Sequence, residues 1–227
     1  MIHYNDYYDG IEDYADSVGF VADYCRTIII DTLGFRSEID DNDGIYDIYI
    51  MQLQPGNYGR NWKDPDGSPE GSSFITIDDD YASGYYTEGI NTMKITIAHE
   101  FFHAIQRAYL QSDSYNDFFF ELSSVWIEDV IFPDINDYIL FGPAAGDYFD
   151  NPEIIIDQCN GYGLGLYGHY LNYYFGDNTM HDIWNILSII DINQNNYILN
   201  AIDLVLVNNN SSFIQTWLDF NSKNLFN

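Results

Sequence analysis

Residues 94–106 read KITIAHEFFHAIQ and contain the pattern His-Glu-x-x-His, formed by His99, Glu100 and His103. The nearest positions around the pattern (96–97, 101–102 and 104–105) carry no charge and no proline interrupts the stretch, which predicts a buried helix over residues 91–110. In a helix, His99 and His103 lie one turn apart on the same face. Polar groups of this kind are costly to bury without a partner, so the pattern predicts that something binds at this face.

A metal ion is the partner that this spacing favours. Two imidazoles at positions i and i+4 can bind one Zn²⁺, and the neighbouring glutamate can accept a proton from a zinc-bound water. We therefore predict His99 and His103 as metal ligands and Glu100 as a general base. The alternative is a structural helix in which local hydrogen bonds satisfy the same three side chains.

A third ligand is expected, because a catalytic zinc ion usually has three protein ligands and one water. The extended pattern with a third histidine is excluded, because Gln106 stands at its glycine position and Tyr109 at its third histidine position. Glu121 is preferred, because the 17 residues between it and His103 suffice for a helix–turn–helix that returns over the motif. Glu128, two turns further along the same face, is the alternative ligand.

The residues that surround the ligands would orient them. If Glu121 binds the metal, Glu128 or Asp129 is expected to hydrogen-bond a histidine ligand from behind. The alternative for Glu121 is an ordinary acidic residue favoured by the dipole at a helix N-terminus. Three phenylalanines directly precede Glu121, which argues that its position is buried.

Three stretches together resemble a known class of enzymes. Residues 99–106 (HEFFHAIQ), residues 121–129 (ELSSVWIED) and residues 136–138 (NDY) resemble the gluzincin class of zinc metallopeptidases, and more closely a group of bacterial metalloproteases that are mostly secreted. The resemblance covers roughly residues 45–190. It implies a zinc peptidase with peptide or protein substrates, outside the cell.

The resemblance also implies a hydrogen-bond donor for the substrate carbonyl oxygen, on which negative charge builds up during hydrolysis. Gluzincin aminopeptidases carry a tyrosine in a Y-x-x-G pattern, and Tyr162 stands in such a pattern with Gly165. His169 is a second candidate. With 21 tyrosines in the chain, packing is the competing interpretation of Tyr162, and a surface or packing role competes for His169.

The layout of elements predicts an α+β fold. Residues 46–53 and 73–78 have the alternating, β-branched and aromatic composition of strands, and residues 55–71 between them are rich in turn formers and read as a loop. Helical spacing is found at 10–35, 116–132, 164–175, 180–190, 197–207 and 213–225. We expect one zincin-like domain over residues 1–227, with a small sheet lobe (about 1–110), a mainly helical lobe (about 111–227) and the site between them.

Composition limits the partners. The net charge is −29, with 7 Lys and Arg against 36 Asp and Glu, which argues against binding to nucleic-acid phosphates or to anionic membranes. No apolar run reaches the ~20 residues of a membrane span. The acidic start lacks the features of a signal peptide, so an exported protein would have an unconventional signal or one absent from this chain. Cys25 and Cys159 fit either one disulfide or two free buried thiols.

Two functional classes remain open beside a peptidase. One is a non-catalytic, zinc-stabilised binding or adhesion domain, although the presence of Glu100 favours catalysis over it. The other is a metal-independent helical interaction module. Among peptidases, residues 71–76 lack the acidic anchor motif of aminopeptidases, which favours an endopeptidase.

Overall fold

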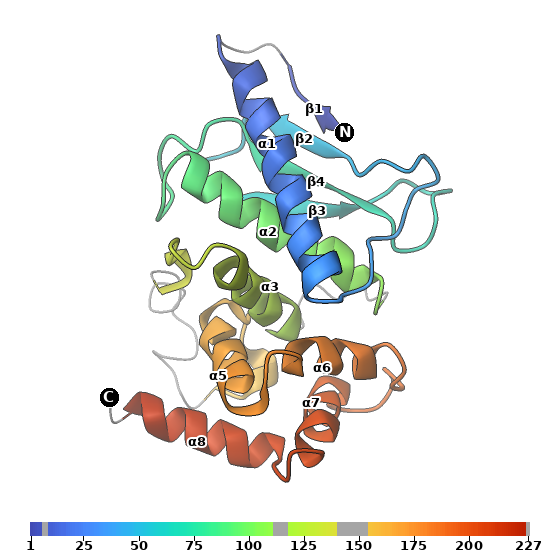
Figure 1. Cartoon of the computed structure of the whole chain (residues 1–227), viewed down its shortest axis with the longest axis vertical. Coiled ribbons are helices and arrows are strands. Elements are labelled where there is room, and N and C mark those ends of the chain that lie inside the picture. Colours follow the sequence, from blue (N-terminus) through green and yellow to red (C-terminus); the bar gives the residue numbers. More distant parts are fainter. Residues whose placement is uncertain (6–8, 111–117, 140–153, 226–227) are drawn as a thin grey trace.

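The computed structural model describes residues 1–5, 9–110, 118–139 and 154–225. The part up to residue 110, which we call the sheet region, holds a small mixed sheet of four strands and two long helices. The part from residue 118 onward, the helical region, contains helices and turns in its described residues. Figure 1 shows the sheet region at the top and the helical region below it, which confirms the predicted α+β arrangement.

The sheet has the strand order β1-β2-β4-β3. Strands β1 (Ile2–His3), β2 (Ile48–Met51) and β4 (Ser73–Asp78) run parallel, and β3 (Gly59–Lys63) pairs antiparallel with β4. The predicted strands at 46–53 and 73–78 are found as β2 and β4. Both place isoleucines in the core, because alternate side chains of a strand point to the same face.

The prediction of a loop over residues 55–71 is wrong for residues 59–63, which form the edge strand β3. The sequence GRNWK has no apolar alternation, so local composition gives no strand signal. Backbone pairing with β4 holds the strand instead, and the indole of Trp62 donates a hydrogen bond of 2.9 Å to the hydroxyl of Thr76. The two-residue strand β1 was also not expected from the sequence.

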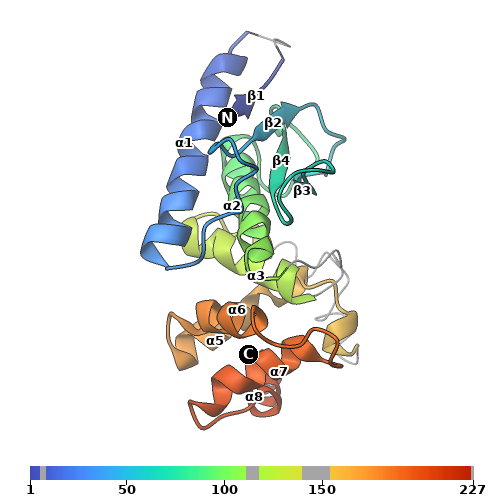
Figure 2. The same cartoon turned by 90° about the vertical axis from the view of Figure 1, so that its right-hand side faces the viewer.

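Helices α1 (Ile11–Arg26) and α2 (Ile90–Arg107) belong to the sheet region. Helix α1 continues into a π-helix (Thr27–Thr32), and Gly34 follows with φ of 78°, close to the end of the helix predicted over residues 10–35. Figure 2 shows α2 between α1 and the sheet. Most side chains of α2 are therefore buried, which explains why charges are rare along it.

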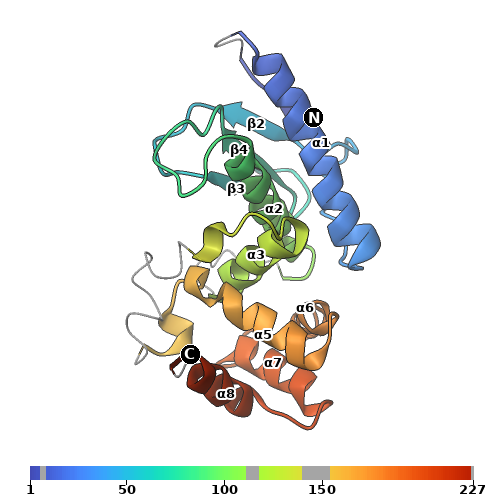
Figure 3. The same ribbon diagram turned by 60° about the vertical axis from the view of Figure 1, so that its left-hand side comes forward.

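The helical region begins with α3 (Phe118–Ile131), which packs under α2 and above α5 (Gly165–Phe175) (Figure 3). Helices α6 (Thr179–Leu187), α7 (Tyr197–Val207) and α8 (Phe213–Leu225) complete it, close to the predicted ranges. Helix α5 approaches α3 closely, because Gly165 and Gly168 face it without side chains. A Cβ added to Gly165 would lie 2.6 Å from Cγ1 of Val125.

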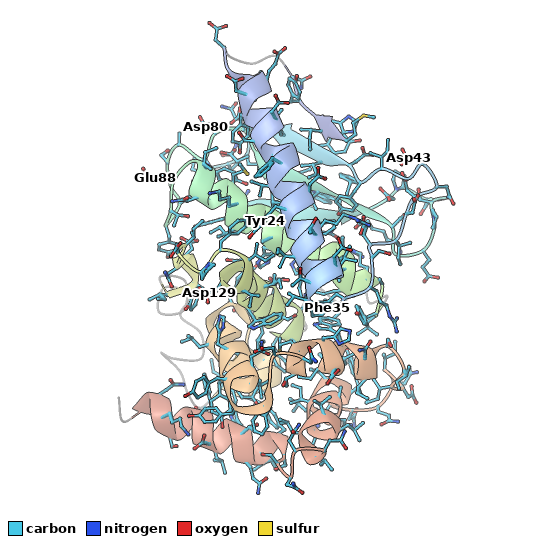
Figure 4. The ribbon with its side chains drawn as sticks, in the orientation of Figure 1. Tyr24, Phe35, Asp43, Asp80, Glu88 and Asp129 are labelled. Carbon is cyan, nitrogen blue, oxygen red and sulfur yellow. The ribbon has the colours of Figure 1, made fainter. Side chains whose placement is uncertain are left out.

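One hydrophobic core extends through both regions. Phe35 lies just beyond the π-helix that follows α1, where the two regions meet (Figure 4), and its ring contacts Phe102 edge-on with centroids 5.1 Å apart. Trp184 of α6 is fully buried and packs against Phe120 at 5.0 Å and Phe119 at 5.5 Å. This aromatic cluster fixes α3 and α6 against the end of α2.

Both cysteines are free and buried, so the disulfide alternative is wrong and the alternative of two thiols holds. Among the described residues, no helix combines the length and the apolar character that crossing a bilayer requires. This agrees with the expectation from the sequence.

Candidate metal centre

The three residues of the sequence motif lie in the buried middle of α2. His99, Glu100 and His103 are 6%, 8% and 9% exposed. The two imidazole rings lie one helical turn apart, with centroids separated by 4.8 Å. The central position of α2, covered by the sheet on one side and by α3 on another, removes these polar groups from water.

Glu121 reaches this face from the first turn of α3. One carboxylate oxygen lies 3.1 Å from Nε2 of His99, and the other lies 3.6 Å from Nε2 of His103. One potential ligand atom from each residue lies within 4.8 Å of the others. The structure thus brings together the three residues expected as ligands, and this group could hold a metal ion.

The opposite ring nitrogens of both histidines have their own partners. Nδ1 of His99 lies 2.6 Å from Oε1 of Glu128, and Nδ1 of His103 lies 2.7 Å from Oε1 of Gln106. Because both partners are acceptors, they favour a hydrogen on each Nδ1 and leave a lone pair on each Nε2 of a neutral ring. Two lone pairs and a carboxylate that converge on one point repel one another unless a proton or a metal cation lies between them, so the donor set fits a metal ion.

The same geometry separates the roles of the two glutamates. Glu121 faces the Nε2 atoms, whereas Glu128 lies behind His99 and is 4% exposed. The carboxylate of Asp129 lies 3.3 Å from Nε2 of His169. The position expected for an orienting carboxylate is therefore occupied by Glu128.

The pKa values follow from burial and from these pairs. Without a bound metal ion, burial opposes the charge on His99, but its hydrogen bonds with Glu121 and Glu128 raise its pKa well above the ordinary value. A proton and a metal ion would therefore compete for Nε2 of His99. Burial would raise the pKa of Glu121, yet the two histidines hold it well below its usual range. Burial raises the pKa of Glu128 to about 7, although His99 opposes this. Glu121 is therefore ionised, which is the form that binds a metal.

A cavity of about 370 Å³ adjoins this group. Its wall combines residues of the motif helix with residues from α3, from the turn before α5 and from the chain that leads into β3. The lining residues are Gly56, Asn57, Tyr58, Gly59, Ile95, Thr96, His99, Glu100, Glu128 and Tyr162. Glu100 thus borders both a space for a ligand and the candidate metal ligands.

The chain from residue 56 to residue 59 forms a cavity wall that sequence reasoning missed, because it was expected to be a loop. A Cβ added to Gly59 would lie 2.7 Å from Cγ2 of Thr96 and 3.3 Å from Cγ of Glu100. A glycine at the start of a strand can indicate such a close approach, and this was the available signal. Tyr58 is fixed nearby, because its hydroxyl donates to Asp137 at 3.0 Å.

Tyr162 lies beside the candidate ligands. Its ring is parallel to that of His99, with centroids 5.7 Å apart and an angle of 5°. The preceding Gly161 has φ of 93°, and a Cβ there would lie 2.1 Å from the carbonyl oxygen of Phe118, so only glycine permits this path. Burial, followed by the charges of Glu121 and Glu100, raises the pKa of Tyr162 far above its usual range. Its hydroxyl therefore stays protonated and can donate a hydrogen bond.

His169, the second candidate donor, lies on α5 and is not part of the cavity wall. It pairs with Asp129, which Figure 4 shows on α3, and its ring lies 5.7 Å from that of Tyr138. Of the two candidates, the structure brings only Tyr162 to the cavity.

Comparison of the sequence with models of known protein families gave no match, and comparison with curated proteins gave none either. The assignment of a function therefore depends on the residues of the site itself.

Proposed function

We propose that this protein is a zinc-dependent peptidase of the gluzincin class, built as a single zincin-like domain. The observation that carries the proposal is the convergence of His99, His103 and Glu121 beside a cavity that Glu100 borders. Two histidines and one glutamate are a typical ligand set of catalytic zinc, which keeps a position open for water. The resemblance of the sequence to zinc metallopeptidases supports the same assignment.

Each residue has a defined role in this proposal. A bound zinc ion supplies Lewis-acid chemistry, polarising a water molecule and the scissile carbonyl group. Glu100 accepts the proton of the attacking water and passes it to the leaving amine. Tyr162 donates a hydrogen bond to the carbonyl oxygen as negative charge develops on it. Glu128 holds the ring of His99 from behind.

We propose that the substrate is an internal segment of a peptide or protein. Strand β3 is one of the two edge strands of the sheet, and Gly59 at its start lines the cavity. An extended peptide can pair with such an edge and continue past the catalytic residues in both directions, which suits an endopeptidase. Secretion is proposed from the resemblance alone, and detection of the protein in culture medium of the source cells would test it.

The test combines metal analysis with cleavage assays on a library of peptides. We expect one zinc per chain and peptide hydrolysis by the wild type. Glu100→Gln should retain zinc and lose roughly 10²–10⁴-fold in turnover, because it cannot accept the proton. Tyr162→Phe should retain zinc and lose about 10²–10³-fold, because it lacks the donor.

Three results would contradict this proposal or one of its parts. A wild type that binds zinc but cleaves no peptide or protein would support the non-catalytic, zinc-stabilised binding domain instead. A wild type that takes up no zinc, even after incubation with it, would support a metal-independent interaction module. A Glu100→Gln variant as active as the wild type would show that another group acts as the base.

A further inference from the structure

Gln106 lies one turn after His103 on α2, is 1% exposed, and uses both ends of its side-chain amide. Its Oε1 atom lies 2.7 Å from Nδ1 of His103. Its Nε2 atom donates toward α3, to the carbonyl oxygen of Phe120 at 2.9 Å and to the hydroxyls of Ser123 at 3.1 Å and Ser124 at 3.0 Å. This amide therefore bridges the helix of the sequence motif and the helix that carries Glu121.

The contacts on α3 determine which way the amide points. The carbonyl oxygen of Phe120 can only accept a hydrogen bond. The hydroxyl of Ser123 uses its hydrogen to donate to the carbonyl oxygen of Phe119 at 2.7 Å, so toward Gln106 it can only accept a hydrogen bond. The NH₂ group of Gln106 must then face α3, and its oxygen must face His103. In an inverted amide, the oxygen of Gln106 would face two other acceptors, the carbonyl oxygen of Phe120 and the hydroxyl oxygen of Ser123. The NH₂ group would face Nδ1 of His103.

The orientation of the amide has a consequence for His103. An oxygen 2.7 Å from Nδ1 holds a hydrogen on that nitrogen, which leaves the lone pair of the neutral ring on Nε2. Nε2 is the nitrogen that faces Glu121. The hydroxyl of Ser124, 3.3 Å from Nδ1, lies on the same side of the ring and can share this hydrogen.

We propose that Gln106 is a positioning residue that locks His103 in the metal-binding tautomer and sets the spacing between His103 and Glu121. Phe120, whose carbonyl oxygen binds the amide, directly precedes Glu121 in the chain, so one side chain fixes two ligands relative to each other. This inference depends on the metal centre of the proposed function.

The hydrogen-bond partner at Nδ1 of His103 differs in kind from the partner at Nδ1 of His99. Glu128 accepts from Nδ1 of His99 through a carboxylate, which has no donor end and cannot be inverted. The amide of Gln106 can be inverted, and only its three contacts on α3 prevent this. Although Gln106 lies on the same helix as His103, its function depends on the other helix.

The experiment measures zinc affinity by competition with a chromogenic chelator, and the visible spectrum of the Co²⁺-substituted protein. Gln106→Met keeps the length of the side chain but removes both hydrogen-bonding ends. It should weaken zinc binding about 10–100-fold, the usual loss for an orienting group of a ligand. Gln106→Glu retains an acceptor for His103 but loses the donor end and turns a carboxylate oxygen toward the carbonyl oxygen of Phe120, so it should recover only part of this loss.

Thr92→Val is the matched control. Thr92 is also a buried polar residue of α2, but its hydroxyl bonds to Thr87 rather than to a ligand. It should leave zinc affinity and the Co²⁺ spectrum unchanged. Should Gln106→Met not fold, the double variant Ser123→Ala, Ser124→Ala replaces it. That variant keeps Gln106 but removes two acceptors of its amide, and it should weaken zinc binding by about 10-fold.

Several outcomes would overturn the inference. One is a folded Gln106→Met variant with wild-type zinc affinity and Co²⁺ spectrum. Equal weakening by Gln106→Met and Gln106→Glu would overturn the tautomer role, because the retained acceptor would then be irrelevant. Failure of the metal centre is distinguishable, because the wild type would then bind no zinc at all. Failure of the peptidase activity alone would appear in the cleavage assay and would leave the comparison of zinc affinities intact.

Discussion

The sheet region and the helical region contribute to the candidate site in different ways. In the sheet region, His99, Glu100 and His103 lie within five consecutive residues of one helix, so their mutual geometry follows from the helix itself. In the helical region, Glu121 and Glu128 come from α3, whereas Tyr162 comes from the turn before α5. Their geometry depends on how these elements pack. The geometry of one helix thus positions three residues of the candidate site, and the packing of several elements positions the other three.

The largest expected effect tests whether both halves bind the metal. His103→Ala and Glu121→Gln should each weaken zinc binding by more than about 100-fold, since each removes a ligand rather than an orienting partner. Glu128→Gln should cost less, about 10–100-fold, because it loses only the support behind His99. Isothermal titration with zinc measures all three. If Glu121→Gln kept its zinc and Glu128→Gln lost it, the roles of the two glutamates would be reversed.

The second-largest expected effect is a loss of stability, and it tests whether the sheet region and the helical region unfold together. Trp184→Ala should destabilise the protein by about 3–5 kcal/mol, because a fully buried indole between α2, α3 and α6 is replaced by a cavity. Urea denaturation followed by circular dichroism gives the free energy of unfolding. We expect one transition in the wild type and in the variant. Two separate transitions in the variant would show that the regions are only weakly coupled.

A smaller loss of stability is expected when one glycine in each region is replaced by alanine. Gly161→Ala should cost about 2–3 kcal/mol, because it combines positive φ with a collision against a carbonyl oxygen. Gly59→Ala should cost about 1–2 kcal/mol, because its Cβ would lie 2.7 Å from the carbonyl oxygen of Thr76. Thermal unfolding measures both. Gly67→Ala is the control for a glycine with positive φ and open space around it.

The two glycine variants should also differ in their effect on the site. Gly161→Ala displaces the turn that carries Tyr162, whereas Gly59→Ala pushes against Glu100. Both should reduce turnover more than they reduce zinc affinity. If Gly161→Ala left turnover unchanged in the folded protein, Tyr162 would not need its observed position.

The smallest effect is expected in the rate of thiol labelling, with one cysteine in each region as the reporter. Burial raises the pKa of the Cys25 thiol far above its ordinary value, and Cys159 is 2% exposed, so neither should react with a thiol reagent in the folded protein. Two thiols per chain should react after unfolding. Labelling at intermediate urea concentrations, followed by mass spectrometry, shows which region opens first. Fast labelling of Cys25 in the folded protein would contradict the described packing of α1.

Much of the fold could be predicted, because periodic apolar residues determine helices and strands locally. The long helices and the strands β2 and β4 were expected close to their observed positions. Strand β3 was not, because its residues are polar and its pairing with β4 is a property of the sheet rather than of the segment. The cavity wall at residues 56–59 was missed for the same reason.

The sequence by itself determined the imidazole pair and the adjacent carboxylate, because helical periodicity places residues four apart on one face. It also narrowed the third ligand to Glu121 or Glu128, which share a face of α3. Only the tertiary structure shows which of the two faces the candidate site, since the approach of α3 to α2 directs Glu121 to the Nε2 atoms and Glu128 to Nδ1 of His99. It also brought Tyr162 rather than His169 to the cavity, because the close glycine packing of this segment on α3 fixes where each lies.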